Sequence, residues 1–130
     1  MISGYINASV RAAAIDGGIE PMEADEQALA DFLDSLDELI IVEGINDEKA
    51  LLRHGVDPDL IVVLNKGQTL EQTVEAISVV DRAIILTDMD RAGKELRHKL
   101  IRLFGLYGIR EHKKPRELFA RLHLSHVEGL

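Results

Sequence analysis

The segment 83–96 (AIILTDMDRAGKEL) limits the possible folds of this chain more than any other stretch of its sequence. Its apolar run leads directly into two aspartates one residue apart, Asp88 and Asp90, and then into Gly93 and a helical pattern. An uninterrupted apolar run of this length is typical of a parallel strand that is covered on both faces. We therefore predict a buried strand that delivers two carboxylates to its own exit.

The segment 39–51 (LIIVEGINDEKAL) has the same pattern. Its apolar run is followed by Glu43 and Gly44, and Asn46 or Asp47 is expected to cap the helix that comes next. The carboxyl ends of parallel strands lie along one edge of a sheet, so both strands should end in acid at the same edge.

Strand and helix patterns alternate along the rest of the chain, with room between strands for one helix and two short loops. Such repeated units predict right-handed crossovers and an α/β fold with a four-stranded parallel sheet in the order 2-1-3-4, with helices on both faces. Only that order brings the two acidic exits side by side. The expected strands are 39–42, 60–64, 83–87 and a weak fourth at 106–109; the expected helices start at Pro21, at 46 or 47, at 69 within a Thr69–Gln72 capping box, at about Arg91 with an end at Gly105, and at Pro115.

The size of the chain, 130 residues, predicts one core. We expect an N-terminal arm at 1–20, which has no sustained period, and one domain at 21–130 with an N-terminal helix and a C-terminal helical extension. No apolar run approaches the ~20 residues that a bilayer span needs, so no membrane partner is expected. The sequence has no cysteine and no signal-peptide pattern, and a cytoplasmic location is the expectation.

The net charge of −8 is distributed unevenly. Residues 91–130 hold ten of the 15 Lys and Arg but only four of the 23 Asp and Glu. A basic third beside an acidic cluster is compatible with a phosphate-rich partner, RNA or DNA, although an ordinary solvated helix face would look the same. The candidate nucleic-acid contacts are Lys66, Arg91, Lys94, Lys113, Lys114 and Arg116.

The acids at the predicted sheet edge are candidate metal ligands. Asp88 and Asp90 stand at i and i+2, so they can point the same way and share a hard cation, and Glu43 can complete the set. Mg²⁺ prefers one or two carboxylates together with waters and substrate phosphates. Gly44 and Gly93 lack side chains where a phosphate or a metal would approach the backbone.

Each of these residues also has a simpler interpretation. The aspartate pair could only cap the following helix, and Asp47 could be an ordinary first-turn acid. Glu43 is harder to explain in this way, because a carboxylate directly behind an apolar strand is costly to desolvate unless it is paired or metal-bound.

The two motifs, Glu43-Gly44 with Asp47 and the run from Thr87 to Gly93 (TDMDRAG), resemble the signature motifs of the Toprim domain. This domain is shared by bacterial primases, type IA and type II topoisomerases, overcoming-lysogenization-defect nucleases, recombination-repair proteins and the 5S ribosomal RNA maturase. The resemblance covers about 39–109, and the chain as a whole looks like small stand-alone archaeal Toprim proteins, most similar to the maturase branch. It implies a Rossmann-like Toprim fold, Mg²⁺ (or Mn²⁺) at Glu43, Asp88 and Asp90, and catalytic roles for Glu43 as general acid or base and for Asp47.

Three functional hypotheses follow. The first is a Mg²⁺-dependent nuclease or nucleotidyl transferase that acts on RNA or DNA, as a homodimer or within a larger nucleic-acid-processing complex. The second is a non-catalytic nucleic-acid-binding or adaptor module. The third, a phospho-aspartate receiver, would need a fifth strand followed by a lysine, and the sequence shows neither. No topoisomerase tyrosine domain, primase zinc domain or helicase accompanies the motifs in this sequence.

Overall fold

The computed structural model describes residues 21–122, 124 and 127–130, so the predicted arm at 1–20 lies outside the described residues. Four parallel strands form one sheet in the order β2-β1-β3-β4, which confirms the predicted order. The strands are β1 (Ile40–Val42), β2 (Ile61–Val63), β3 (Arg82–Ile85) and β4 (Arg110–Glu111). In register, Ile40 pairs with Ile61 on one side and with Ile84 on the other.

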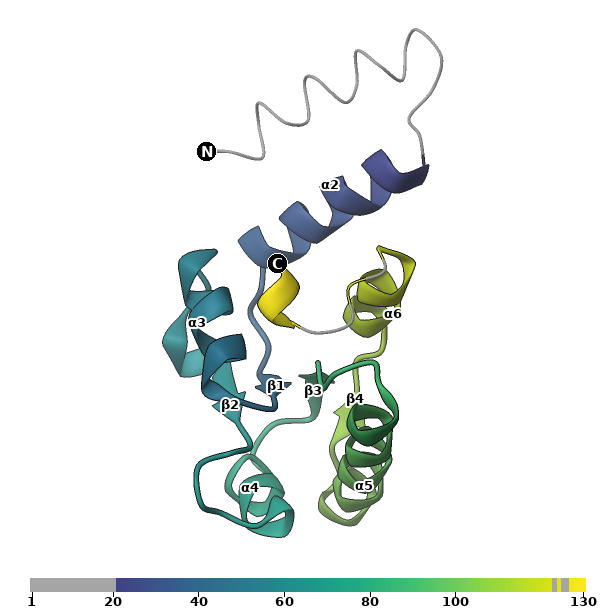
Figure 1. The fold of residues 1–130 in the computed structure, drawn as a ribbon. Helices are drawn as coiled ribbons and strands as arrows, with labels where there is room; N and C mark the ends of the chain where they lie inside the picture. The colour runs from purple at the N-terminus through teal and green to yellow at the C-terminus, as the bar shows by residue number, and fades with distance from the viewer. Residues whose placement is uncertain (1–20, 123, 125–126) are drawn as a thin grey trace, which may run out of the picture.

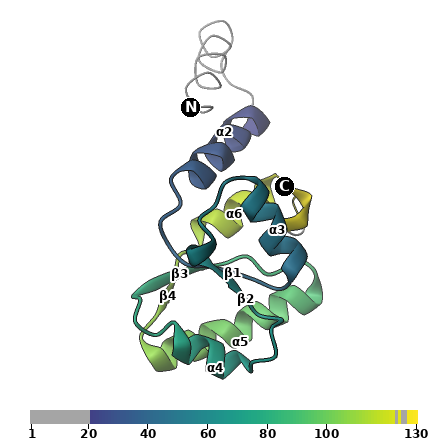
Figure 2. The same ribbon diagram turned by 90° about the vertical axis from the view of Figure 1, so that its left-hand side faces the viewer.

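Helices cover both faces of the sheet, as Figure 1 and Figure 2 show. One face carries α3 (Ile45–Arg53) and α6 (Lys114–Arg121), with α2 (Pro21–Asp34) packed across α6 and a short 3₁₀ helix (Val127–Gly129) against α3. The other face carries α4 (Leu70–Ala76) and α5 (Arg91–Tyr107), and a second 3₁₀ helix (Pro58–Leu60) precedes β2. Of the helices described, none is long and apolar enough to cross a membrane.

The core has two halves because successive strand residues point to opposite faces. Ile40 and Val42 pack with Leu51 and Phe119 on the α3/α6 face. Ile41 lies in the other half of the core, which α4 and α5 cover. Every residue of β1 is fully buried, and the unbroken apolar run of this strand reflects burial on both faces.

Two predicted boundaries are wrong. Helix α5 does not end at Gly105 but continues to Tyr107, and it ends at Gly108, which takes the left-handed conformation with φ of 74°. The fourth strand therefore lies at Arg110–Glu111 and not at 106–109. A glycine inside a helix costs only about 1 kcal/mol, and Tyr107, which lies beyond Gly105, still packs against the core on the α4/α5 face.

The helix starts are closer to the prediction. Thr69 accepts a hydrogen bond from the Gln72 amide at 3.1 Å, and the Gln72 side chain accepts one from the Thr69 amide at 2.9 Å, which confirms the capping box. Helix α3 differs, because its N-cap is Gly44 and not Asn46 or Asp47.

Candidate functional site

The ends of β1 and β3 meet through a hydrogen bond between the two motifs. Glu43 follows β1 directly, and Asp88 lies in the loop after β3. The Asp88 amide donates to Glu43 Oε2 at 2.6 Å, a short bond of the kind that carboxylates form. Because β1 and β3 are neighbours in the sheet, residues 45 positions apart in sequence form one site.

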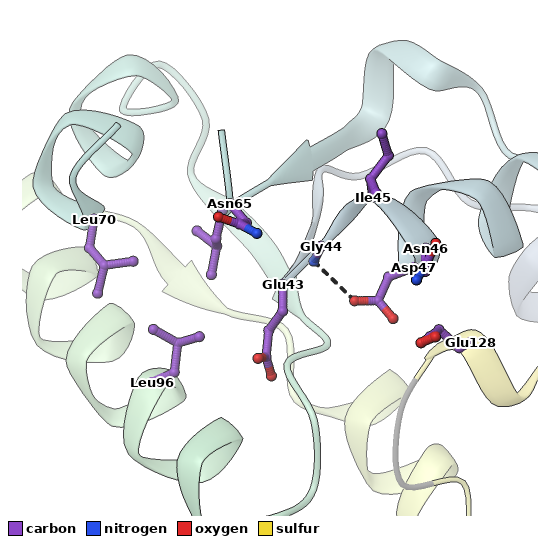
Figure 3. Close-up of a pocket in the computed structure, with 10 residues that line it drawn as sticks. Glu43, Gly44, Ile45, Asn46, Asp47, Asn65, Leu70, Leu96 and Glu128 are labelled. Atoms are coloured by element: carbon purple, nitrogen blue, oxygen red, sulfur yellow. Dashed lines mark hydrogen bonds between the residues drawn. The ribbon is translucent and has the colours of Figure 1, made fainter. Parts of the chain in front are cut away.

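A pocket of about 510 Å³ opens beside Glu43, the acceptor of this bond. In Figure 3, the Glu43 side chain projects into the pocket between Leu96 of α5 and the acidic side formed by Asp47 and Glu128. Asn65, from the loop after β2, lies at the upper side of the same pocket. The pocket therefore has one apolar wall and one wall of carboxylates and amides.

Asp47 has a structural task in this site. It occupies the third position of α3, where its Oδ2 accepts a hydrogen bond from the Gly44 amide at 3.1 Å, and only 6% of its surface is exposed. It thus fixes the turn that follows Glu43. A Cβ on Gly44 would meet nothing within 4 Å and the φ of Gly44 is −143°, so the fold itself does not require glycine there.

Asp90 is the N-cap of α5. Its Oδ1 accepts a hydrogen bond from the Gly93 amide at 2.7 Å, which satisfies one of the free amides at the helix start. The capping interpretation thus holds for one oxygen of Asp90, while a carboxylate keeps further lone pairs for a cation.

Gly93 is required by the chain's own backbone. A Cβ at this position would lie 2.0 Å from the carbonyl oxygen of Asp88. The group that lies close to Gly93 is thus the backbone of the loop that carries Asp88. The same loop is linked to α5 by Thr87, whose hydroxyl donates to the Gly93 carbonyl at 2.7 Å.

Arg116 lies in a different place from the one expected of a nucleic-acid contact. It is buried, with 7% of its surface exposed, and its guanidinium donates to the Thr87 carbonyl at 2.7 Å, the Thr87 hydroxyl at 3.1 Å and the Asp88 carbonyl at 3.1 Å. Burial lowers the pKa of Arg116, with a further contribution from the neighbouring charge of Arg97, while Glu111, Glu43 and Asp88 act in the opposite direction. The sequence did contain one signal, since Arg116 stands three residues before the inward-facing Phe119 on the same helix.

The other predicted nucleic-acid contacts are exposed. Arg91 lies 3.2 Å from Glu95 on α5, and Lys66 lies 3.8 Å from Glu48. Exposed ion pairs of this kind are weak and leave both cations available to a polyanion. The predicted nucleic-acid contacts that are exposed are Lys66, Arg91, Lys94, Lys113 and Lys114.

The carboxylate oxygens at this edge of the sheet are suitable ligands for a hard cation. Glu43, Asp88 and Asp90 offer only carboxylate oxygens, and they stand at the exits of two neighbouring strands. Within residues 21–122, 124 and 127–130, no three His, Asp or Glu side chains are already gathered as a metal-binding group. A Mg²⁺ ion held by one or two carboxylates and completed by water and phosphate needs no such group, so the residues present fit it.

The sequence of this chain is similar to a known domain family and to known proteins. Residues 38–122 match the Toprim domain. A UPF0292 protein of Pyrococcus horikoshii is 32% identical over 107 residues, which cover 80% of each chain. A UPF0292 protein of Thermococcus onnurineus is 33% identical over 104 residues, covering 80% of this chain and 77% of the relative.

A solved structure of a protein from Aquifex aeolicus has the same fold. It superposes with a TM-score of 0.68 over 82% of this chain and 95% of its own, at 22% sequence identity. The matched range 38–122 contains both acidic motifs, the pocket loop with Asn65, and Arg116.

Proposed function

Because this chain belongs to the Toprim domain family, we propose that it performs Mg²⁺-dependent phosphotransfer on nucleic acid, with cleavage of RNA or DNA phosphodiester bonds as the reaction. Toprim domains are typically metal-binding modules of nucleic-acid processing. The observation that carries the proposal is the hydrogen bond between Glu43 and the Asp88 amide, since it unites the two motifs beside one pocket.

The proposed roles follow from position. Glu43 projects into the pocket and acts as the general acid or base that moves a proton at the reacting oxygen. Asp88 and Asp90, together with Glu43, would hold Mg²⁺ or Mn²⁺, which neutralises charge on the phosphate when bound. Asp47 supports the reaction by fixing the Gly44 amide and thereby the backbone that follows Glu43.

The exposed basic residues supply the affinity in this proposal. Lys94 lies in the first turn of α5 and Lys114 begins α6, while Lys113 precedes it. They carry positive charge on the helices that follow the acidic edge and the last strand, and in this proposal they bind the phosphates of the nucleic acid.

The test is incubation with structured RNA, single-stranded DNA and duplex DNA, with Mg²⁺ or Mn²⁺ against EDTA. We expect cleavage that requires the metal, and a loss of ~10² to 10⁴ in rate for Glu43→Gln with nucleic-acid affinity preserved. Glu128→Gln is the matched control, because Glu128 lines the same pocket but lies on the 3₁₀ helix Val127–Gly129, outside both acidic motifs, and it should keep most of the activity. Full activity in Glu43→Gln would remove Glu43 from the chemistry.

Metal binding is tested separately by titration with Mn²⁺. Asp88→Asn combined with Asp90→Asn should abolish binding, and Asn at position 90 can still cap α5, so the helix start is preserved. Asp57→Asn is the control, since Asp57 caps the 3₁₀ helix before β2 in the same manner. Equal Mn²⁺ affinity in the double variant would place the metal elsewhere.

One observation favours a second candidate, a binding or adaptor module without catalysis. Asp47 and Asp90 each use a carboxylate oxygen to hold a backbone amide, as structural residues do. Binding of nucleic acid in the same assay, without cleavage under any metal condition, would support this candidate over the nuclease.

A further inference from the structure

Arg116 continues the hydrogen-bond ladder of β3 beyond the point where the neighbouring strand ends. Along the β4 side of β3, carbonyls two residues apart point the same way. The Asp81 carbonyl accepts from the Arg110 amide at 2.8 Å, and the Ala83 carbonyl accepts from the His112 amide at 2.9 Å. The next two carbonyls in this row belong to Ile85 and Thr87.

β4 is too short to reach those carbonyls, since its pairing with β3 stops at Ala83 and Glu111. Arg116 reaches them from α6, because its Nη1 lies 2.7 Å from the Thr87 carbonyl and 3.4 Å from the Ile85 carbonyl. Its Nη2 donates to the Asp88 carbonyl at 3.1 Å. A side chain thus occupies the place of a strand along the segment that carries the aspartates.

The same loop contacts Glu43 through its other side. Asp88 accepts from Arg116 with its carbonyl and donates to Glu43 with its amide. The guanidinium fork is planar and rigid, so it can fix several acceptors at once, which a lysine ammonium cannot do. Arg116 therefore constrains the peptide groups on both sides of the Asp88 Cα.

We propose that Arg116 is a positioning residue for the carboxylate site: it holds the 87–88 backbone so that the Asp88 amide meets Glu43 before any metal or nucleic acid binds. The importance of this positioning for catalysis rests on the proposed function. The positioning itself does not, and it makes the C-terminal helix α6 part of the site.

The test is hydrogen exchange of single amides in the metal-free protein, comparing wild type with Arg116→Met and Arg116→Lys. The Asp88 amide should exchange roughly tenfold faster or more in both variants, as expected when a charge-assisted hydrogen bond is lost. The Leu86 amide, which donates to the Ile41 carbonyl at 2.8 Å inside the sheet, should keep its wild-type rate. If Arg116 only stabilises the fold, its replacement would instead raise the exchange rates of the Asp88 and Leu86 amides equally, and this result would overturn the proposal.

Arg97→Met is the matched control. Arg97 is a half-buried arginine on α5, and it donates two hydrogen bonds, each 2.7 Å long, to Glu111. It should leave the ratio of the Asp88 and Leu86 exchange rates unchanged. If Arg116→Met does not fold, Arg116→Lys decides the question, because it keeps the charge and most of the side chain. Wild-type protection of the Asp88 amide from exchange in Arg116→Lys would show that the guanidinium group is not needed.

Mn²⁺ titration gives a second readout. Arg116→Lys should bind Mn²⁺ more weakly than wild type, whereas Arg97→Met should bind it as wild type does. Unchanged Mn²⁺ affinity in Arg116→Lys, despite a mobile Asp88 amide, would refute a role in the site. Neither measurement uses cleavage, so a protein that cleaves nothing would refute the nuclease while leaving the positioning role standing.

Discussion

Gly93 shows at the scale of one residue how closely the site is packed. We expect Gly93→Ala to lower the free energy of unfolding by about 1–3 kcal/mol, because the new Cβ would overlap the Asp88 carbonyl oxygen, which is backbone and cannot swing away. The measurement is chemical denaturation at neutral pH.

Gly105→Ala is the control for this substitution within the same helix. A Cβ there meets nothing within 4 Å, so this change should raise the stability by up to about 1 kcal/mol through helix propensity. Equal effects of the two substitutions would show that the Asp88 loop moves freely away from α5.

The residues of the candidate site differ in how far the sequence could predict them. Glu43 and Asp88 were predictable because each directly follows a buried apolar run, and their strands could be paired by the order of the units. The burial of Arg116 was not, because it depends on which carbonyls of β3 lack a strand partner, and that is decided by the length of β4. A lysine-rich neighbourhood at 113–114 made Arg116 look like one more surface cation.

At the scale of the helix, the capping box of α4 gives a direct test. Thr69→Ala should lower the free energy of unfolding by about 1 kcal/mol, because the Gln72 amide loses its acceptor at the helix start. Thr69→Ser keeps the hydroxyl and should cost much less. Denaturation curves of the two variants give the comparison, and an alanine variant as stable as the serine variant would mean that water replaces the cap without loss.

The end of α5 was harder to predict than the starts of α4 and α5. Side-chain caps such as Thr69 and Asp90 mark a start by chemistry that the sequence displays. Helix α5 could end at Gly105 or at Gly108, and packing decides between them. The apolar face of α5 continues through Phe104 toward Tyr107, so the chain turns at Gly108.

At the scale of the whole molecule, the proposed function and the uneven charge together predict how nucleic acid would be held. Reversing Lys94 and Lys114 to Glu should weaken binding to RNA and DNA of any sequence and should reduce the dependence of log affinity on log salt by about one unit per lost phosphate contact. Only 4% of residues are aromatic, so base stacking cannot compensate.

The control carries the same change of charge on another helix, outside the basic third. Lys49→Glu with Arg53→Glu alters two exposed cations of α3 and should leave the salt slope unchanged apart from a small general repulsion. The measurement is affinity by fluorescence anisotropy across a salt series. Equal losses in both double variants would mean that net charge, and not the basic third, governs binding.

Glu38, which precedes β1, contacts Arg82 at the start of β3 and His112 directly after β4. Partial burial alone would raise the pKa of Glu38, but the hydrogen bonds from His112 and Arg82 outweigh it, and the pKa is lowered from 4.5. A lowered pKa in the folded state means that the stabilisation is present above the unfolded value and is lost as pH falls through the folded value.

We therefore expect the stability difference between wild type and Glu38→Gln to be constant well above pH 4.5 and to shrink below it. Denaturation curves from pH 7 down to pH 3 measure this difference. A difference that grows on acidification would have the wrong sign for a lowered pKa.

The position of Arg116 on α6 has a consequence for the order in which the site is completed during synthesis. The ribosome produces the chain from its N-terminus, and folding can begin before synthesis ends. Both strands that lead into the acidic motifs leave the ribosome before α6 does, so a nascent chain carries Glu43 and Asp88 while the guanidinium that holds the loop is still absent. The formation of α6 thus sets the moment at which the carboxylate site becomes ordered.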